Sequence, residues 1–166
     1  MKAGLGLGSN VGDRLRHLQQ ARDFLQSLSA QRWLRASPVF ETEPVDCPPG
    51  AGPFLNAVVE IEYDQTPRQL LAAILAYELA HGRDRSGGVN APRPVDLDIL
   101  YFGDQQLAEP DLIVPHPRLT QRRFVLLPLA SLEPDLILAG TGQSVAARLR
   151  ELPAGGGAVT LWQADW

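Results

Sequence analysis

The stretch Arg93-Pro94-Val95-Asp96-Leu97-Asp98-Ile99-Leu100-Tyr101-Phe102-Gly103 has the composition of a buried strand but carries two acidic residues. Most of its apolar residues are β-branched or aromatic, which suits a pleated, largely buried surface. Because side chains alternate across a strand, Asp96 and Asp98 are expected on one face, with Cα atoms about 7 Å apart. The ordinary alternative is a solvated strand face, since carboxylates inside an apolar run are costly unless that face is wet.

The two carboxylates favour a cation site. Asp96 and Asp98 supply only oxygen ligands, which suit Mg²⁺. Two such ions would sit about 3.5–4 Å apart in a two-metal site. Arg93 lies just upstream and is suited to a phosphate bound to such a cation. The stretch therefore predicts a site where cations and phosphate meet.

The segments that surround this stretch alternate between strand and helix patterns. Apolar residues recur at helical spacing from Arg14 to Leu28, and Thr66-Pro67 has the residues that open a second helix. Apolar runs predict four strands: Lys2 to Leu7, Trp33 to Phe40, Phe54 to Tyr63 and Val95 to Phe102. Pro38 is expected to make the end of the second strand irregular.

The order strand, helix, strand, strand, helix, strand is that of a ferredoxin-like βαββαβ core. The expected class is α+β, with an antiparallel sheet and its two core helices packed on one face. Arg122 to Leu132 and Gln143 to Leu152 are expected as C-terminal helical additions. The whole chain, residues 1–166, is expected to form one domain.

Composition excludes several classes of function. The net charge is −4, which does not favour nucleic-acid binding, and no apolar run is long enough to span a membrane. Lys2 is the only lysine, so a P-loop lysine is absent, and the histidines do not cluster as zinc ligands. Cys47 is the only cysteine, which rules out a disulfide within the chain. We expect a cytoplasmic monomer without nucleic-acid or membrane partners.

Three loops are expected at one end of the sheet: Gly8 to Asp13, Glu43 to Pro53 and Arg83 to Pro94. The third leads directly into the aspartate strand and carries arginines and glycines. Converging loops with arginines and paired carboxylates indicate a phosphate-transfer site that closes over its ligands.

From about Leu5 to Asp135 the chain resembles the 6-hydroxymethyl-7,8-dihydropterin pyrophosphokinase family of folate biosynthesis. The matching segments are Gly6-Leu7-Gly8-Ser9-Asn10, Gly12-Asp13, Ser37 to Thr42, Phe54-Leu55-Asn56-Ala57, Glu78, Gly82-Arg83, Arg85, Pro92-Arg93, Asp96-Leu97-Asp98-Ile99-Leu100, Val114-Pro115-His116-Pro117, Arg122 and Phe124 to Leu129. The order of these motifs is highly specific. Ala91, Asn90, Leu75 and Asp111 depart from residues common in the family.

The resemblance implies transfer of the β,γ-diphosphate of ATP to the hydroxymethyl group of the dihydropterin, with release of AMP. It implies that Asp96 and Asp98 hold two Mg²⁺ ions, that Asp98 helps to take the hydroxyl proton, and that Arg83 and Arg93 steady the transferred group. The implied contacts to ATP are Glu78, Arg85, Ile99, Ile113, His116 and Arg122. The implied pterin site consists of Thr42 and Val45 through their main chains, Asn56 through its amide, and Phe54 and Phe124 by stacking.

Two other classes of function compete with this hypothesis. One is a ferredoxin-like sensor that binds the pterin without turnover, and the other is a different Mg²⁺-dependent phosphotransferase or phosphohydrolase. The sensor has no need of paired metal ligands or of the arginines. Nucleic-acid binding is a more distant alternative, because the sequence has no basic stripe.

Overall fold

The computed structural model describes residues 1–44, 49–82, 94–153 and 157–166. Its main sheet is antiparallel, and the strands run in the order β5-β1-β4-β3-β8, with β2 pairing beside β3 on β4. The bounds are β1 Lys2–Ser9, β2 Leu34–Ala36, β3 Val39–Thr42, β4 Phe54–Glu62, β5 Asp96–Phe102 and β8 Val159–Gln163. A separate hairpin consists of β6 Leu107–Glu109 and β7 Leu112–Val114.

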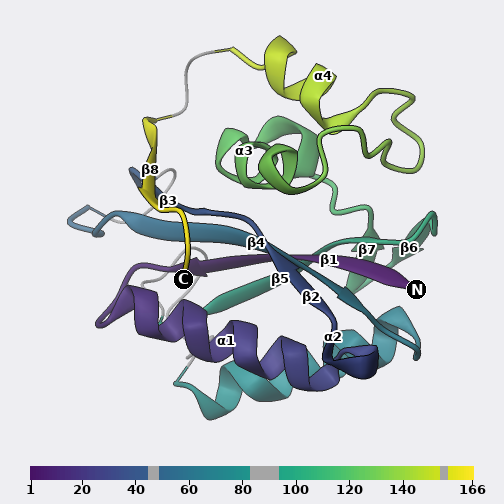
Figure 1. The fold of residues 1–166 in the computed structure, drawn as a ribbon, viewed down its shortest axis with the longest axis horizontal. Helices are drawn as coiled ribbons and strands as arrows, with labels where there is room; N and C mark the ends of the chain where they lie inside the picture. The colour runs from purple at the N-terminus through teal and green to yellow at the C-terminus, as the bar shows by residue number, and fades with distance from the viewer. Residues whose placement is uncertain (45–48, 83–93, 154–156) are drawn as a thin grey trace.

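Helices cover both faces of the sheet (Figure 1). The core helices α1 (Arg14–Leu28) and α2 (Pro67–Ala80) lie on one face, while α3 (Arg123–Leu132) and α4 (Val145–Glu151) lie on the other. Short 3-10 turns occupy Ala30–Arg32 and Leu119–Gln121. The ferredoxin-like core and the C-terminal helical additions are confirmed, and the additions make the sheet the middle layer of three.

The core helices begin where their capping residues predict. The Asp13 side chain accepts a hydrogen bond from the backbone N–H of Arg16 at the start of α1. Thr66 and Gln69 form a capping box at the start of α2, with Pro67 in its first turn. Such caps satisfy N–H groups that have no partner within the helix. Local sequence is therefore sufficient to begin both helices.

The segment from Trp33 to Phe40, which was expected as one strand with an irregular end at Pro38, is divided there into two strands. The chain forms β2 and β3, separated by Ser37 and Pro38, because proline has no N–H to donate to the ladder. Ser37 maintains the connection to β4: its N–H donates to the Val58 carbonyl (2.8 Å), and its hydroxyl accepts from the Val58 N–H (2.9 Å).

Two other boundaries also differ from expectation. The first strand continues to Ser9, so Gly8 is not in the turn but in the ladder, opposite Asn56 on β4 and Asp96 on β5. The C-terminal segment adds an edge strand, β8, beside β3. Both differences result from long-range strand pairing, which local patterns do not reveal.

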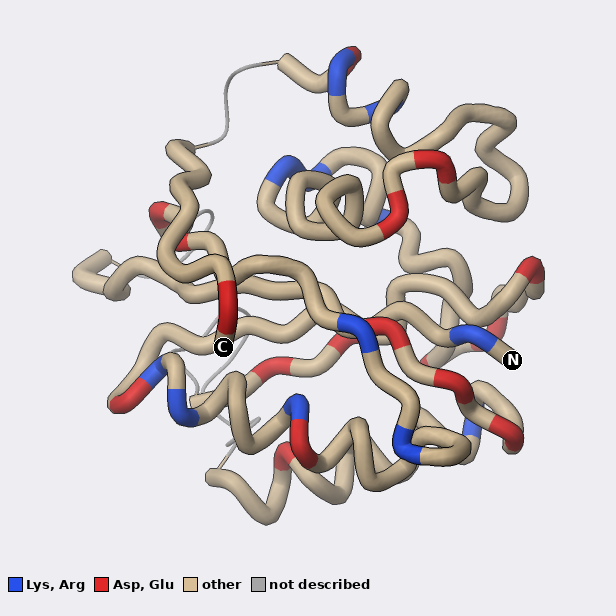
Figure 2. Tube along the Cα trace, in the orientation of Figure 1, with Lys and Arg blue, Asp and Glu red and all other residues tan. Residues whose placement is uncertain are grey.

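The sheet separates two apolar cores. Leu5 and Leu7 face α1 and α2 together with Leu97 and Ile99, whereas Val58 packs in the core beneath α3. In the described part of the chain, no helix is both long and apolar enough to cross a membrane. Acidic and basic residues are interspersed along the described trace (Figure 2).

Candidate active site

The alternating pattern of β5 places the two aspartates as expected. Asp96 pairs with Gly8 and Asp98 with Gly6 on β1, while Leu97 between them packs in the core under α1 and α2. The aspartates therefore belong to the opposite face, the one that α3 covers farther along. Both side chains are half-buried.

Gly8 is the point where three candidate residues converge. A Cβ atom at Gly8 would lie 3.3 Å from Asn56 Oδ1, 3.9 Å from Asp96 Cβ and 3.9 Å from Phe54 Cδ1. Asn56 and Phe54 come from β4 and Asp96 from β5, so side chains from two strands meet above the bare backbone of the strand between them. A larger residue here would compete with Asn56 for space. The candidate pterin and metal residues are thus adjacent.

The amide of Asn56 is held in a defined orientation. Its Nδ2 donates to the hydroxyl of Thr42 at 2.8 Å, and both side chains are buried. The amide can still offer its carbonyl oxygen and its second N–H, which is the pattern that recognises an amide-like heterocycle edge. The family resemblance implies a main-chain contact for Thr42, and the structure adds the hydrogen bond of its side chain to Asn56.

His116 lies where it can contribute a neutral hydrogen-bond donor. Its backbone N–H donates to the Leu100 carbonyl at 2.8 Å, and the Arg118 N–H donates to its Nδ1 at 3.2 Å. A ring that accepts at Nδ1 carries its proton on Nε2. Desolvation, together with the Arg122 and Arg118 charges, lowers the pKa of His116 to about 4, against a smaller opposing effect of Asp96.

Asp96, His116 and Arg122 lie in one region, because the charges of Asp96 and Arg122 both affect the pKa of His116. Arg122 directly precedes α3, and its guanidinium lies 5.5 Å from the ring centre of Phe124. The Arg122 guanidinium is suited to bind the phosphates of a nucleotide, and the Phe124 ring beside it is suited to stack on a planar heterocycle. The aromatic candidates come from different elements, Phe54 from β4 and Phe124 from α3.

Glu78 occupies a more buried position than a surface nucleotide contact requires. It is 1% exposed and accepts the N–H of Leu97 at 2.8 Å, in the middle of the aspartate pair. Because β5 is an edge strand of the main sheet, this bond ties its outer side to α2. The adenine candidates differ from one another: Ile99 is buried in the core, and Ile113 on β7 is exposed.

Arg14 is a structural residue of this end that the sequence did not reveal. Its guanidinium donates to the Pro53 carbonyl at 2.8 Å, pairs with Glu41 at 2.9 Å and lies 5.1 Å from the Trp162 ring centre. It thus links α1, β3, β8 and the start of β4. No local motif marks such a role. The candidates Val45, Arg83, Arg85 and Arg93 lie outside the described residues.

Among the described residues, no group of three or more His, Cys, Asp or Glu side chains is placed to hold a metal ion. Asp96 and Asp98 remain a pair of hard oxygen donors on one strand face. This donor set fits Mg²⁺, which is usually held by one or two carboxylates together with water and substrate phosphates.

The chain is similar to known proteins over most of its length. The family model for 7,8-dihydro-6-hydroxymethylpterin-pyrophosphokinase matches residues 4–134. The 2-amino-4-hydroxy-6-hydroxymethyldihydropteridine pyrophosphokinase of Pseudomonas aeruginosa is 40% identical over 134 residues, which cover 81% of this chain and 82% of the relative. The protein of the same name from Bacillus subtilis is 42% identical over 128 residues, or 77% of this chain and 75% of the relative.

Other relatives are much longer than this chain. The folic acid synthesis protein fol1 of Schizosaccharomyces pombe is 38% identical over 155 residues, which are 92% of this chain but 20% of that protein. A Plasmodium falciparum HPPK-DHPS crystal structure superposes with a TM-score of 0.71 at 14% identity, covering 90% of this chain and 45% of the other. A further HPPK-DHPS crystal structure, in complex with substrates, has a TM-score of 0.68 at 12% identity and is covered to 42%. At these identities the structural matches show the shared fold.

Proposed function

Because the chain belongs to the 7,8-dihydro-6-hydroxymethylpterin-pyrophosphokinase family, it is a pyrophosphokinase of folate synthesis, and we propose the reaction that its residues perform. The chain transfers the β,γ-diphosphate of ATP to the hydroxymethyl group of 6-hydroxymethyl-7,8-dihydropterin. The substrate oxygen forms a bond to the β-phosphorus, the bond between that phosphorus and the α-phosphate oxygen breaks, and AMP leaves. We propose that the single domain 1–166 carries this activity as a cytoplasmic monomer.

The pterin end of the site selects a flat heterocycle with an amide-like edge. Asn56, held by Thr42, presents one acceptor and one donor to that edge, while main-chain groups of Thr42 and Val45 complete the set. Phe54 and Phe124 stack on the two faces of the ring. A ligand that lacks the edge leaves buried polar groups without partners, so the site discriminates strongly against it.

The phosphate end is built around the aspartate pair. Asp96 and Asp98 would hold two Mg²⁺ ions, which when bound supply neutralising charge to the attacking and leaving oxygens. Asp98 also accepts the proton of the substrate hydroxyl. Glu78 keeps β5 straight between these two residues through its bond to Leu97 and borders the nucleotide.

The remaining residues bind ATP. His116, neutral at pH 7 because of its lowered pKa, donates from Nε2 to a phosphate oxygen, and Arg122 contributes a fixed positive charge beside it. Arg85 adds a further contact to the triphosphate. Arg83 and Arg93 steady the transferred group, and Ile99 and Ile113 border the adenine.

One observation carries this proposal: Asn56, the candidate residue for binding the heterocycle edge, lies next to Asp96, a candidate metal ligand. The two side chains meet at Gly8. Diphosphate transfer requires the hydroxymethyl group of the heterocycle to lie beside the phosphate bound to the metal. A binding module without turnover has no need for this adjacency.

The test is to identify the nucleotide product. The protein is mixed with ATP, MgCl₂ and the dihydropterin, and nucleotides are separated by chromatography while ³¹P NMR follows the new diphosphate ester. AMP with the dihydropterin diphosphate supports the proposal. ADP would indicate an ordinary kinase, and dihydropterin binding without any nucleotide product would indicate a sensor. Omission of Mg²⁺ with excess EDTA serves as the control for metal dependence.

A further inference from the structure

A group of charged and polar side chains lies beneath the C-terminal end of α3, away from the residues described above. This anchor cluster consists of Lys2, Arg35, Glu60, Tyr101 and Glu133. Lys2 Nζ lies 3.1 Å from Glu60 Oε1 and 3.5 Å from Glu133 Oε1. The Tyr101 hydroxyl donates to Glu60 Oε2 at 2.5 Å. Arg35 forms an ion pair with Glu133 and lies 3.8 Å from Glu60. The two cations balance the two carboxylates.

Stability alone does not explain a carboxylate at the centre of this cluster. Glu60 is 1% exposed, and burying an ion pair costs about as much as its attraction returns, so apolar replacements are often neutral. Burial and the bond to Glu60 raise the pKa of Tyr101, so its hydroxyl stays protonated and donates. Glu60 also raises the pKa of Lys2, which stays charged. Both carboxylate oxygens of Glu60 therefore have partners whose hydrogen bonds depend on direction.

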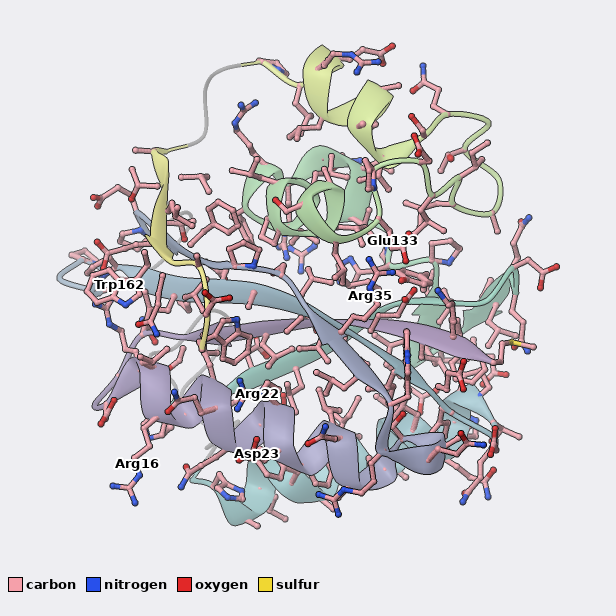
Figure 3. The ribbon with its side chains drawn as sticks, viewed as in Figure 1. Arg16, Arg22, Asp23, Arg35, Glu133 and Trp162 are labelled. Carbon is pink, nitrogen blue, oxygen red and sulfur yellow. The ribbon has the colours of Figure 1, made fainter. Side chains whose placement is uncertain are left out.

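These directional bonds join four strands to one end of α3. Lys2, Arg35, Glu60 and Tyr101 lie on β1, β2, β4 and β5. Arg35 Nη2 donates to the carbonyl of Leu132, the last residue of α3, at 2.8 Å. Arg35 and Glu133 lie together between α3 and the sheet (Figure 3). The last carbonyls of a helix have no partner within it and favour a nearby cation, so this contact ties the end of α3 to β2.

The apolar contacts of α3 do not define its position along its axis in the same way. Leu126 and Leu129 pack on Val58, and the burial of apolar surface is not directional. Hydrogen bonds, by contrast, weaken steeply as their distance and angle depart from the optimum. The anchor cluster is consequently the part of this interface most sensitive to sliding or tilting of α3.

The opposite end of α3 carries Phe124, and Arg122 directly precedes its first residue. Pro128 lies inside α3 and has no N–H to donate to the Phe124 carbonyl, yet the helix is continuous from Arg123 to Leu132. A continuous helix of 10 residues is about 15 Å long, so a shift of its C-terminal end also moves Phe124. We propose that Arg35 and Glu133 are positioning residues: by fixing the C-terminal end of α3, the anchor cluster sets the place of Phe124 above the sheet and hence the stacking of the dihydropterin. This inference rests on the proposed function.

The test is Arg35→Met in the full chain, which removes both the ion pair and the bond to Leu132 while keeping an unbranched side chain. Dihydropterin binding is measured by isothermal titration calorimetry in the presence of a non-hydrolysable ATP analogue, and ATP binding is measured separately. The expected result is dihydropterin affinity weakened about 5- to 10-fold and ATP affinity changed less than about twofold. Stacking depends on the position of Phe124 on α3, whereas Glu78, Ile99, Ile113 and His116 lie outside α3.

Leu25→Ala is the matched control. Leu25 is fully buried in α1 on the other face of the sheet, so its truncation lowers the melting temperature without disturbing α3. Its dihydropterin affinity is expected to equal that of the wild type. A loss of affinity as large as that in Arg35→Met would mean that destabilisation alone is responsible, and it would overturn the positioning role.

Glu133→Gln keeps the test decisive if Arg35→Met does not fold. Its side chain is 26% exposed, so the substitution is tolerated, yet it weakens the pairs with Arg35 and Lys2. The same selective loss, of smaller size, is expected. Wild-type protein that binds no dihydropterin would refute the proposed function itself. Wild-type binding combined with unchanged affinity in the variants that fold would refute only the positioning role.

Discussion

The two ends of one sheet face are built alike and differ in what faces the glycine of β1. At one end Asn56 and Asp96 meet above Gly8. At the other end Tyr101 lies across Gly4, where a Cβ atom would lie 2.0 Å from the ring, and its hydroxyl reaches Glu60 on the far side of β1. In both places the glycine on β1 has no side chain, so the side chains of β4 and β5 on either side of it can approach each other.

The difference lies in how the polar groups are used. Glu60 is surrounded by Lys2, Tyr101 and Arg35, so its end is a closed anchor beneath α3. Asn56 is held on one side by Thr42, and its carbonyl oxygen and second N–H can still bind a ligand. The comparison teaches that a bare central strand creates room, while the covering elements decide whether that room becomes a structural contact or a binding site.

The largest effect is expected from removing the charge at the phosphate end. Asp98→Asn keeps the shape of the side chain but weakens metal binding and proton acceptance. We expect AMP formation to slow by at least about 10²- to 10³-fold, with dihydropterin affinity changed less than about threefold. Single-turnover rates and titration calorimetry measure the two quantities. A rate within tenfold of wild type would exclude Asp98 as a metal ligand and proton acceptor.

Alanine at the two glycines separates the roles of the two ends. In Gly4→Ala the new Cβ collides with the Tyr101 ring, and we expect unfolding in urea to show a loss of about 1–3 kcal/mol. In Gly8→Ala the Cβ lies 3.3 Å from Asn56 Oδ1, so stability should fall less while dihydropterin affinity falls about tenfold. Equal losses of affinity and stability in the two variants would contradict the division of roles.

The hydroxyl of Thr42 tests whether the orientation of Asn56 matters. Thr42→Val replaces the acceptor of the 2.8 Å bond with a methyl group of similar size. Leaving the Asn56 N–H without a partner should cost about 1–2 kcal/mol of dihydropterin binding, or about 5- to 30-fold in affinity. Thr42→Ser retains the hydroxyl and is expected to bind nearly as well as the wild type. If serine and valine behave alike, the hydroxyl does not orient the amide.

The smallest effect is a pH dependence at the phosphate end. The pKa of His116 is lowered to about 4, whereas the pKa of histidine in an unfolded chain is about 6.5. Between these values the unfolded chain takes up a proton that the folded protein does not, so the free energy of unfolding falls as pH falls. NMR titration of the His116 ring should give a midpoint near 4, and His116→Gln should flatten the stability profile in this window. A ring that titrates near 6.5 would argue against a neutral phosphate donor at lower pH.

Much of the fold could be predicted because its signals are local. The period of the apolar residues defined α1 over Arg14–Leu28, and Thr66 with Pro67 marked the start of α2. The second strand was expected to be irregular at Pro38, but its complete division into β2 and β3 was not. At the break, the Ser37 hydroxyl accepts the Val58 N–H in place of a backbone carbonyl. Such a side-chain replacement for a backbone hydrogen bond depends on the neighbouring strand, so the segment's own sequence does not indicate it.

The candidate site, too, could be predicted from the sequence only in part. Alternation along β5 is enough to put Asp96 and Asp98 on one face, and motif order is enough to indicate the family. The role of Glu60 has no local signal, because an acidic residue in an alternating strand usually faces water. Its burial depends on α3, which is more than 60 residues later in the chain.

The sequence by itself determined the core helices, most of the strands, the acidic pair and the family, because periodicity, capping and motif spacing act between near neighbours. Only the tertiary structure decided which strands adjoin, and hence that Asn56 and Asp96 meet above Gly8 while Tyr101 and Glu60 meet above Gly4. The physical reason is that strand register and layer packing are selected by burial summed over the whole chain.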